Sequence, residues 1–224
     1  MSSARFGSIS TKTDQGNKNR IGETLLVAEF DRREKTFGSM PMMGKANTRL
    51  NYDDYILLPE DKLYEVLDGD LYRVPAPSIR HQRALRNLEF ALIQHVKTRN
   101  PGELFHSPCE VILSDKNIVQ PDILFVRKNR IGIIGELNLR GAPDLVIEIL
   151  SNAMRKKNLR AKRKIYAGFR IQEYWIVDLR IDCIEVLIWS EIGYISGGIY
   201  GKRDKFHSPL LPGLGLLPLK VFSE

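Results

Sequence analysis

Apolar and polar residues recur with two different periods along this chain, and the periods predict where it forms helices and strands. Across residues 78–98 the apolar positions recur every three or four residues, which predicts a helix with one buried face. The same spacing returns at residues 154–169. Short apolar runs typical of buried strands occupy the stretches 109–114, 121–126, 144–150, 173–178, 182–189 and 192–200. Their order predicts an α/β domain in which one mixed sheet is flanked by helices.

Turn signals add smaller elements near both ends of this domain. Asp68-Gly69 separates two apolar stretches within residues 63–75, a strong signal for a β-hairpin with a two-residue turn. Residues 51–58 begin with a capping residue and predict a short helix. The last two predicted strands form a second, C-terminal β-hairpin.

Composition limits the chain to one substantial domain. Its 224 residues are 43% hydrophobic, enough for a single large core. Residues 1–50 are polar, rich in Gly and Ser and poorly periodic, so we expect a disordered extension before a domain at 51–224. Met40, Met42 and Met43 suggest that translation starts there, a hypothesis that intact-mass analysis of the native protein tests.

The same composition argues against a membrane protein and a zinc protein. No apolar run approaches the roughly 20 residues that a membrane span requires. The N-terminus lacks the apolar stretch of a secretory signal, which favours a cytoplasmic location. Cys109 and Cys183 have no metal-ligand spacing and are interpreted as small core residues.

Two acids interrupt neighbouring apolar strands. Asp122 begins one strand, and Glu148 lies inside the next. A buried acid without a partner costs several kcal/mol, so each requires an arginine, backbone N–H groups or a metal ion. Asp144 shares a face with Glu148 but lies about 13 Å along the strand, too far to bind the same ion. Adjacent strands lie about 4.8 Å apart, so Asp122 and Glu148 can both reach a hard divalent cation, Mg²⁺ or Mn²⁺.

The helix that follows the second acid carries a lysine on its apolar side. At about 100° per residue, Lys162 falls within an arc of roughly 140° that also contains Leu159 and Tyr166. Arg155 and Asn158 point inward as well. Lys162 is either a fixed positive charge beside the acids or a lysine whose head group reaches solvent along its apolar stem. The opposite side of the helix is most simply a solvated basic face, and it includes Arg160, Arg163 and Lys164.

The net charge of +7 is unevenly distributed. Residues 155–164 contain seven Lys/Arg residues and no acid, whereas the rest of the domain from residue 51 onward is net acidic. A basic helix beside a candidate metal site favours an anionic polymer as the partner.

A set of short motifs, in a fixed order, gives the chain its resemblance to one family. The motifs are Leu58-Pro-Glu-Asp61, Tyr64-Glu-Val-Leu-Asp-Gly69, Pro77-Ser-Ile-Arg-His81, Gln120-Pro-Asp122, Gly141-Ala-Pro-Asp-Leu-Val-Ile-Glu-Ile-Leu-Ser151, Lys162 with Tyr166, Glu173-Tyr-Trp-Ile-Val-Asp178 and Pro209-Leu-Leu-Pro-Gly213. They cover about residues 51–222. In this order they resemble the Uma-type restriction endonucleases, a bacterial family of the PD-(D/E)XK nuclease superfamily.

The resemblance implies a restriction-endonuclease-like fold and a hydrolase that cleaves DNA phosphodiester bonds with Mg²⁺ or Mn²⁺. It implies that Asp122 and Glu148 are metal ligands. It also implies that Lys162 is their cationic partner, because the usual lysine two residues after the glutamate is Leu150 here. RNA is the alternative substrate. A homodimer is the oligomeric state that stays open.

Accessory candidates come from the matching motifs and from the helix. Glu65 is either an accessory acid or a solvated hairpin residue, and His81 either contacts substrate or caps its helix. Gln120 belongs to the motif of the first acid. Arg155 and Asn158 join them from the inward side of the helix.

The chain departs from the family pattern around this helix. Ser151 is followed by Asn152, Ala153 and Met154 where the family has Pro-Ser-Thr, and Asn158 stands where an aspartate is usual. The three principal residues, Asp122, Glu148 and Lys162, are intact. The alternatives are a catalytically silent nucleic-acid-binding domain and an interaction module of a mobile element or defence system.

Overall fold

The computed structural model describes residues 49–59, 62–150 and 156–223. One compact unit contains every helix and strand named below, and residues 56–59 form a turn that belongs to a second unit. The expected disordered extension and the proposed translation start fall outside the described residues, so both stay predictions.

The described strands form two mixed sheets, which corrects the single sheet expected from the sequence. The larger sheet contains β3 (Gly102–His106), β6 (Ile123–Arg127), β8 (Leu145–Leu150), β9 (Glu173–Asp178), β10 (Cys183–Ser190) and β11 (Gly193–Gly201), in the order β11-β10-β9-β8-β6-β3. The smaller sheet contains β1 (Tyr64–Leu67), β2 (Asp70–Arg73), β4 (Val111–Ser114), β5 (Asn117–Val119) and β7 (Leu139–Arg140), in the order β2-β1-β5-β4-β7.

The prediction missed this division because β5 and β7 are too short to produce a periodic signal. β4 pairs with β5 on one side and with β7 on the other. The two expected hairpins are present: β1 with β2 in the smaller sheet, and β10 with β11 at the edge of the larger sheet.

The first hairpin follows from its turn residues. Asp68 and Gly69 both have positive φ, 51° and 81°, as the two central residues of a type I′ turn require. Asp68 also donates its backbone N–H to the side-chain oxygen of Asn117 on β5, at 2.9 Å. The hairpin is therefore attached to the neighbouring strand of the smaller sheet.

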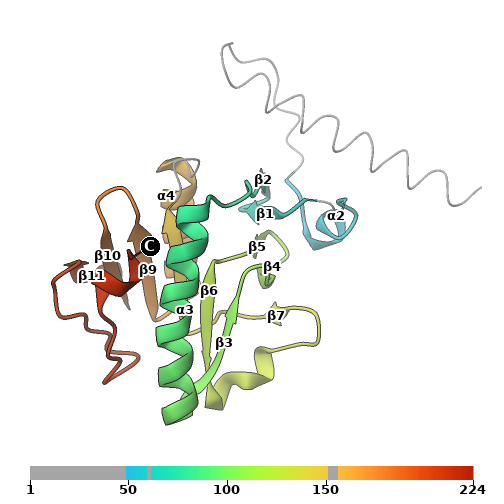
Figure 1. The fold of residues 1–224 in the computed structure, drawn as a ribbon. Helices are drawn as coiled ribbons and strands as arrows, with labels where there is room; N and C mark the ends of the chain where they lie inside the picture. Colours follow the sequence, from blue (N-terminus) through green and yellow to red (C-terminus); the bar gives the residue numbers. More distant parts are fainter. Residues whose placement is uncertain (1–48, 60–61, 151–155, 224) are drawn as a thin grey trace, which may run out of the picture. The chain divides into compact units, whose positions relative to one another are not determined.

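Two long helices cover opposite faces of the larger sheet (Figure 1). α3 (Ile79–Arg99) begins after Ser78, whose hydroxyl accepts the backbone N–H of His81 at 3.2 Å, and it buries Leu85, Leu88 and Leu92. α4 (Lys156–Gly168) contributes Ile165 and Tyr166 to the core on the other face. Both helices lie where their apolar periodicity predicted.

Three short helical segments complete the described part. They are α2 (Tyr52–Tyr55), the 3₁₀ helix η1 (Lys128–Ile133) and α5 (Pro218–Val221). α2 is shorter than predicted but is capped as expected: Asn51 and Asp54 each accept the other's backbone N–H at 3.0 Å. None of the described helices is long and apolar enough to cross a membrane.

The alternation of side chains along β8 positions the second acid. Leu145, Ile147 and Ile149 face the core under α3. Val146 lies in the core on the other face, and Glu148 shares its face by the period of two. The sequence therefore directs the Glu148 carboxylate toward α4.

Candidate active site

A buried ion pair between strand β8 and helix α4 forms the centre of the candidate site. The Lys162 ammonium nitrogen lies 2.8 Å and 3.0 Å from the two carboxylate oxygens of Glu148. The Tyr166 hydroxyl donates to the first of these oxygens at 2.7 Å. Glu148 and Lys162 are 1% and 3% exposed. Lys162 therefore points inward as its helical position predicted, and its head group is enclosed rather than extended to solvent.

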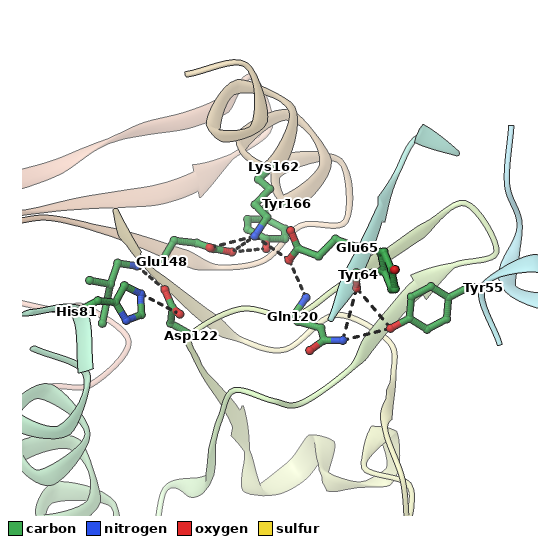
Figure 2. Close-up of polar contacts among 10 residues, drawn as sticks. Tyr55, Tyr64, Glu65, His81, Gln120, Asp122, Glu148, Lys162 and Tyr166 are labelled. Carbon is green, nitrogen blue, oxygen red and sulfur yellow. Dashed lines mark hydrogen bonds and ion pairs between the residues drawn. The ribbon is translucent and has the colours of Figure 1, made fainter. Parts of the chain in front are cut away.

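Glu65 on strand β1 brings a second acid to the same lysine. Its Oε1 lies 2.8 Å from the Lys162 nitrogen and also accepts the backbone N–H of Gln120 at 2.8 Å. The side chain is 5% exposed, so the solvated alternative for this hairpin residue is wrong. One lysine thus bridges acids from the two sheets, as Figure 2 shows.

Asp122 occupies the edge of the cluster, just before β6. The last described pair of β6 and β8 is Ile123 with Ile147, so the antiparallel register brings Asp122 and Glu148 opposite each other one step further on. The Asp122 Oδ2 accepts the backbone N–H of Ile149 at 2.7 Å. The two strands are neighbours, as the sequence argument required.

His81 lies against Asp122 from the first turn of α3. Its Nε2 is 3.2 Å from the Asp122 Oδ1, and its side chain is 8% exposed. Its backbone N–H takes part in the cap of α3 through Ser78, so the residue lies at a helix start and also contacts a candidate metal ligand.

Gln120 connects the cluster to the smaller sheet. Its side-chain Nε2 donates to the Tyr55 hydroxyl at 3.2 Å and to the Tyr64 carbonyl at 3.4 Å. The Tyr55 hydroxyl donates in turn to Glu110 at 2.8 Å. This chain of hydrogen bonds holds the Gln120 backbone where it binds Glu65 (Figure 2).

Buried polar atoms without a hydrogen bond gather around the same cluster. Among the described residues, the three such side-chain atoms are His81 Nδ1, Gln120 Oε1 and the Tyr174 hydroxyl. The Tyr174 ring packs edge-on against Tyr166, with ring centroids 5.1 Å apart. Most buried polar atoms in natural proteins have a hydrogen-bond partner, either protein or ordered water. A bound water or substrate atom at these three positions would complete the hydrogen bonding around the cluster.

Burial and mutual repulsion control the protonation of the acids. Burial, with the charges of Glu65 and Asp122, raises the pKa of Glu148 to about 7, although the Lys162 charge lowers it. Burial lowers the pKa of Lys162, but the charges of Glu148 and Glu65 outweigh it and raise that pKa above the usual value. Burial also opposes the charged form of His81, but its hydrogen bond to Asp122 and the Asp122 charge raise its pKa. Lys162 is thus charged at neutral pH.

Asp122 and Glu148 offer carboxylate oxygens, the kind of ligand that Mg²⁺ and Mn²⁺ prefer. The described residues contain no group of three or more His, Cys, Asp or Glu side chains arranged to hold a metal. Mg²⁺, however, commonly binds one or two carboxylates and completes its shell with water and substrate phosphate. Glu148 and Glu65 share one lysine here, and the Asp122 charge adds to the rise in the pKa of Glu148. A divalent cation beside Asp122 and Glu148 would offset this excess of buried negative charge.

Other predicted residues lie outside this cluster. Arg160, Arg163 and Lys164 are exposed on α4, as their helical positions predicted, and Asn158 is partly buried. Arg155, Asn152 and Ala153 lie outside the described residues. Cys109 and Cys183 are partly buried and unpaired, not full core residues.

Sequence reasoning missed part of the site. Tyr166 was placed on the inward face and, with Lys162, among the matching motifs, but it was given no role in the site. Its spacing of four residues from Lys162 was the available signal, because such residues are neighbours on a helix surface. Tyr55 and Glu110 offered no local signal, since they reach Gln120 only through the pairing of the smaller sheet.

Comparisons with known proteins agree with this fold and its motifs. The family model Uma2, described as "Putative restriction endonuclease", matches residues 52–220. The crystal structure of a putative nuclease belonging to DUF820 from Anabaena variabilis superimposes with a TM-score of 0.66, at 19% identity. That match covers 77% of this chain and 97% of the Anabaena chain, and it shows the shared fold. A comparison with curated proteins finds no match.

Proposed function

The chain belongs to the Uma2 family of putative restriction endonucleases, and from this membership and the buried acid–lysine cluster we propose that it is a metal-dependent endonuclease acting on DNA. The observation that carries the proposal is the Lys162 ammonium enclosed between Glu148 and Glu65, beside Asp122. Burying several acids around one cation is costly. A hydrophobic core of the same size would be stable without these buried charges.

Each residue of the cluster has a role in this proposal. Asp122 and Glu148 would hold Mg²⁺ or Mn²⁺, which as a Lewis acid polarises the scissile phosphodiester. Lys162 supplies a fixed positive charge for the negative charge that develops on the phosphate, an electrostatic contribution that is often the largest in such reactions. Glu65 and Tyr166 hold the Lys162 and Glu148 head groups in place, and the backbone N–H of Ile149 orients Asp122.

His81 is an accessory residue in this scheme. Its contact with Asp122 fixes the carboxylate from the α3 side, while its second ring nitrogen is buried without a partner. A water or a substrate oxygen near the cluster would give that nitrogen a hydrogen bond.

One observation favours the alternative, a catalytically silent nucleic-acid-binding domain. Both Glu148 oxygens already accept hydrogen bonds from Lys162, and one accepts another from Tyr166. A network satisfied in this way can stabilise the fold without turnover. The two functions differ in metal-dependent cleavage, because a silent domain binds DNA and leaves it intact.

The deciding experiment incubates the purified protein with supercoiled and linear DNA in Mg²⁺, Mn²⁺ and EDTA. We expect nicked or linear products in the metal arms and intact DNA with EDTA. Protein that binds DNA in all three arms and cleaves in none would support the silent domain. A parallel arm with single-stranded RNA separates DNA from RNA as the substrate.

A further inference from the structure

A hollow of about 520 Å³ lies at the C-terminal end of α4, against the turn between β10 and β11. Its lining includes Gly168 and Arg170 from the helix end, and Trp189, Glu191 and Gly193 from the hairpin. The volume falls in the range of ligand-binding clefts, about 300–1,000 Å³. None of the residues of the acid–lysine cluster lines it, so it is a separate feature of the same domain.

The side chains of Trp189 and Arg170 form one wall of this hollow. The Trp189 ring nitrogen donates to the Ala167 carbonyl at 2.8 Å, which fixes the plane of the indole. The Arg170 guanidinium carbon lies 5.6 Å from the centre of that ring. Arg170 has a φ of 58° and its backbone N–H binds the Ala167 carbonyl, so its backbone is held as well. The pair is therefore arranged before any ligand arrives.

Two glycines keep the space beside this pair open. A Cβ added to Gly168 or Gly193 would meet no atom within 4 Å. Arg170 is itself exposed, so a planar group can reach its side chain from solvent. Glu191 is the acid in the lining, and a carboxylate accepts hydrogen bonds from base amino groups.

A basic line along α4 leads to the hollow. Arg160, Lys164 and Gly168 are spaced four residues apart, which aligns them on one side of the helix. Both cations are exposed. The helix ends at Gly168, where its dipole disfavours a phosphate but not an uncharged base. Backbone phosphates therefore suit the line, and a base suits the hollow.

We propose that this hollow, which we call the Trp189–Arg170 platform, binds an unpaired nucleobase of a DNA strand whose phosphates follow Arg160 and Lys164. A base inside a duplex has both of its faces covered by its neighbours, so only an unpaired base can stack here. Aromatic rings and guanidinium planes are the groups on which such bases stack. The inference rests on the proposed function only in taking DNA as the substrate. It adds that the preferred DNA carries a single-stranded stretch.

The test measures binding of the full chain to a short single-stranded oligodeoxythymidine and to a paired duplex of equal length, both in EDTA. The chain has two tryptophans, and Trp175 is fully buried, so fluorescence quenching reports on Trp189. We expect the single strand to quench, and Trp189→Phe to remove the quenching. Quenching that survives Trp189→Phe would overturn the platform.

Arg170 variants separate stacking from charge. Arg170→Asn suits the left-handed backbone at this position, and Arg170→Lys keeps the charge but loses the planar group. We expect both to weaken single-strand binding by roughly 5- to 150-fold, the range for losing one base-stacking contact, and to leave duplex binding unchanged. Arg203→Asn removes an exposed charge outside the hollow and serves as the control. Wild-type affinity in Arg170→Lys, or equal losses for both DNAs, would overturn the inference.

Cleavage of duplex DNA is measured on the same variants. If they cleave normally but bind single strands like wild type, the platform is wrong and the nuclease stands. If the platform behaves as expected and no protein cleaves, the nuclease is wrong and the platform stands.

Discussion

Two equally buried acids, one just before strand β8 and one within it, show what separates a structural carboxylate from a candidate catalytic one. Asp144, just before β8, is 0% exposed, and Glu148, within β8, is 1% exposed. Asp144 accepts the backbone N–H of Arg127 at 2.8 Å and a guanidinium N–H of Arg130 at 2.9 Å. It has its own arginine and a backbone donor, as a structural acid usually does.

Glu148 has a different kind of partner. Its lysine is shared with Glu65, and Asp122 lies close enough to add to the rise in its pKa. Burial alone therefore does not identify the functional acid. The acids also differ in how many of them share a cation: Glu148 and Glu65 share Lys162, whereas Asp144 is paired with Arg130. The proposed role of Glu148 rests on this difference.

The largest expected effect comes from removing the two acids proposed to bind the metal ion. Glu148→Ala and Asp122→Ala should abolish metal-dependent cleavage, since either change leaves the ion under-coordinated. Folding should survive, because Lys162 keeps Glu65 as its partner in Glu148→Ala. DNA cleavage with Mg²⁺ and thermal unfolding measure the two properties.

Asp144→Asn, at the equally buried acid just before β8, is the matched control. It should lower the free energy of unfolding by about 1–3 kcal/mol through lost charged hydrogen bonds, while cleavage per folded molecule is unchanged. The comparison fails if the Glu148 and Asp122 variants cleave like wild type, or if Asp144→Asn loses cleavage while folded.

The next effect separates two lysines of the same helix. Lys162→Met should lower the cleavage rate at saturating DNA by about 10²–10³-fold, the range for losing one electrostatic stabiliser of a transition state. Lys164→Met, on the exposed side of α4, should change the rate little. Single-turnover rates at saturation are the measurement, and equal rates for the two variants would refute the role of Lys162.

Lys162→Met should also lower the stability of the protein, whereas Lys164→Met should not. It leaves Glu148 and Glu65 facing each other without their shared cation, which should cost about 3–5 kcal/mol of stability. Rates are therefore compared at a temperature where circular dichroism shows both variants folded. Lys164→Met should unfold like wild type.

A third effect is the pH dependence of stability in metal-free buffer. The pKa of Glu148 is raised to about 7 in the folded protein, above the usual value of about 4.3 for an unfolded chain. Between these values the folded state keeps a proton that the unfolded state has released. The Glu148 contribution to stability should therefore fall as the pH rises from about 4.5 to 7.

Glu148→Gln tests the direction of this pH dependence, because the amide does not titrate. The wild type should lose on the order of 3 kcal/mol relative to the variant across that range, since a tenfold change in proton affinity corresponds to about 1.4 kcal/mol. Urea unfolding at several pH values in EDTA gives the difference. A difference that stays constant with pH would mean that Glu148 has an ordinary pKa.

The smallest effect concerns the outer face of α4. Replacing Arg160, Arg163 and Lys164 together should weaken binding to all DNA sequences similarly. It should also reduce the salt dependence by roughly one unit of slope for each lost phosphate contact. Binding titrations over a range of salt concentrations measure this slope. An unchanged slope would leave these residues as a solvated face and would not affect the proposed chemistry.

Local patterns in the sequence were sufficient wherever neighbours along the chain decide the structure. The apolar period predicted α3 and the facing of Lys162 and Lys164, because a helix repeats every 3.6 residues regardless of what it packs on. Asp68-Gly69 predicted the first hairpin, because its turn requires positive φ at both positions. The neighbouring strands of Asp122 and Glu148 also followed from the sequence order.

The pairing between distant segments was decided only by the tertiary structure. Glu65 enters the site because β1 pairs with β5, with Val66 opposite Ile118, and this register brings its carboxylate to the backbone of Gln120. Nothing in the hairpin itself distinguishes that glutamate from a solvated one. A lysine shared by two acids likewise requires two sheets and a helix to meet, and a pattern with a period of two or 3.6 residues contains no information about such a meeting.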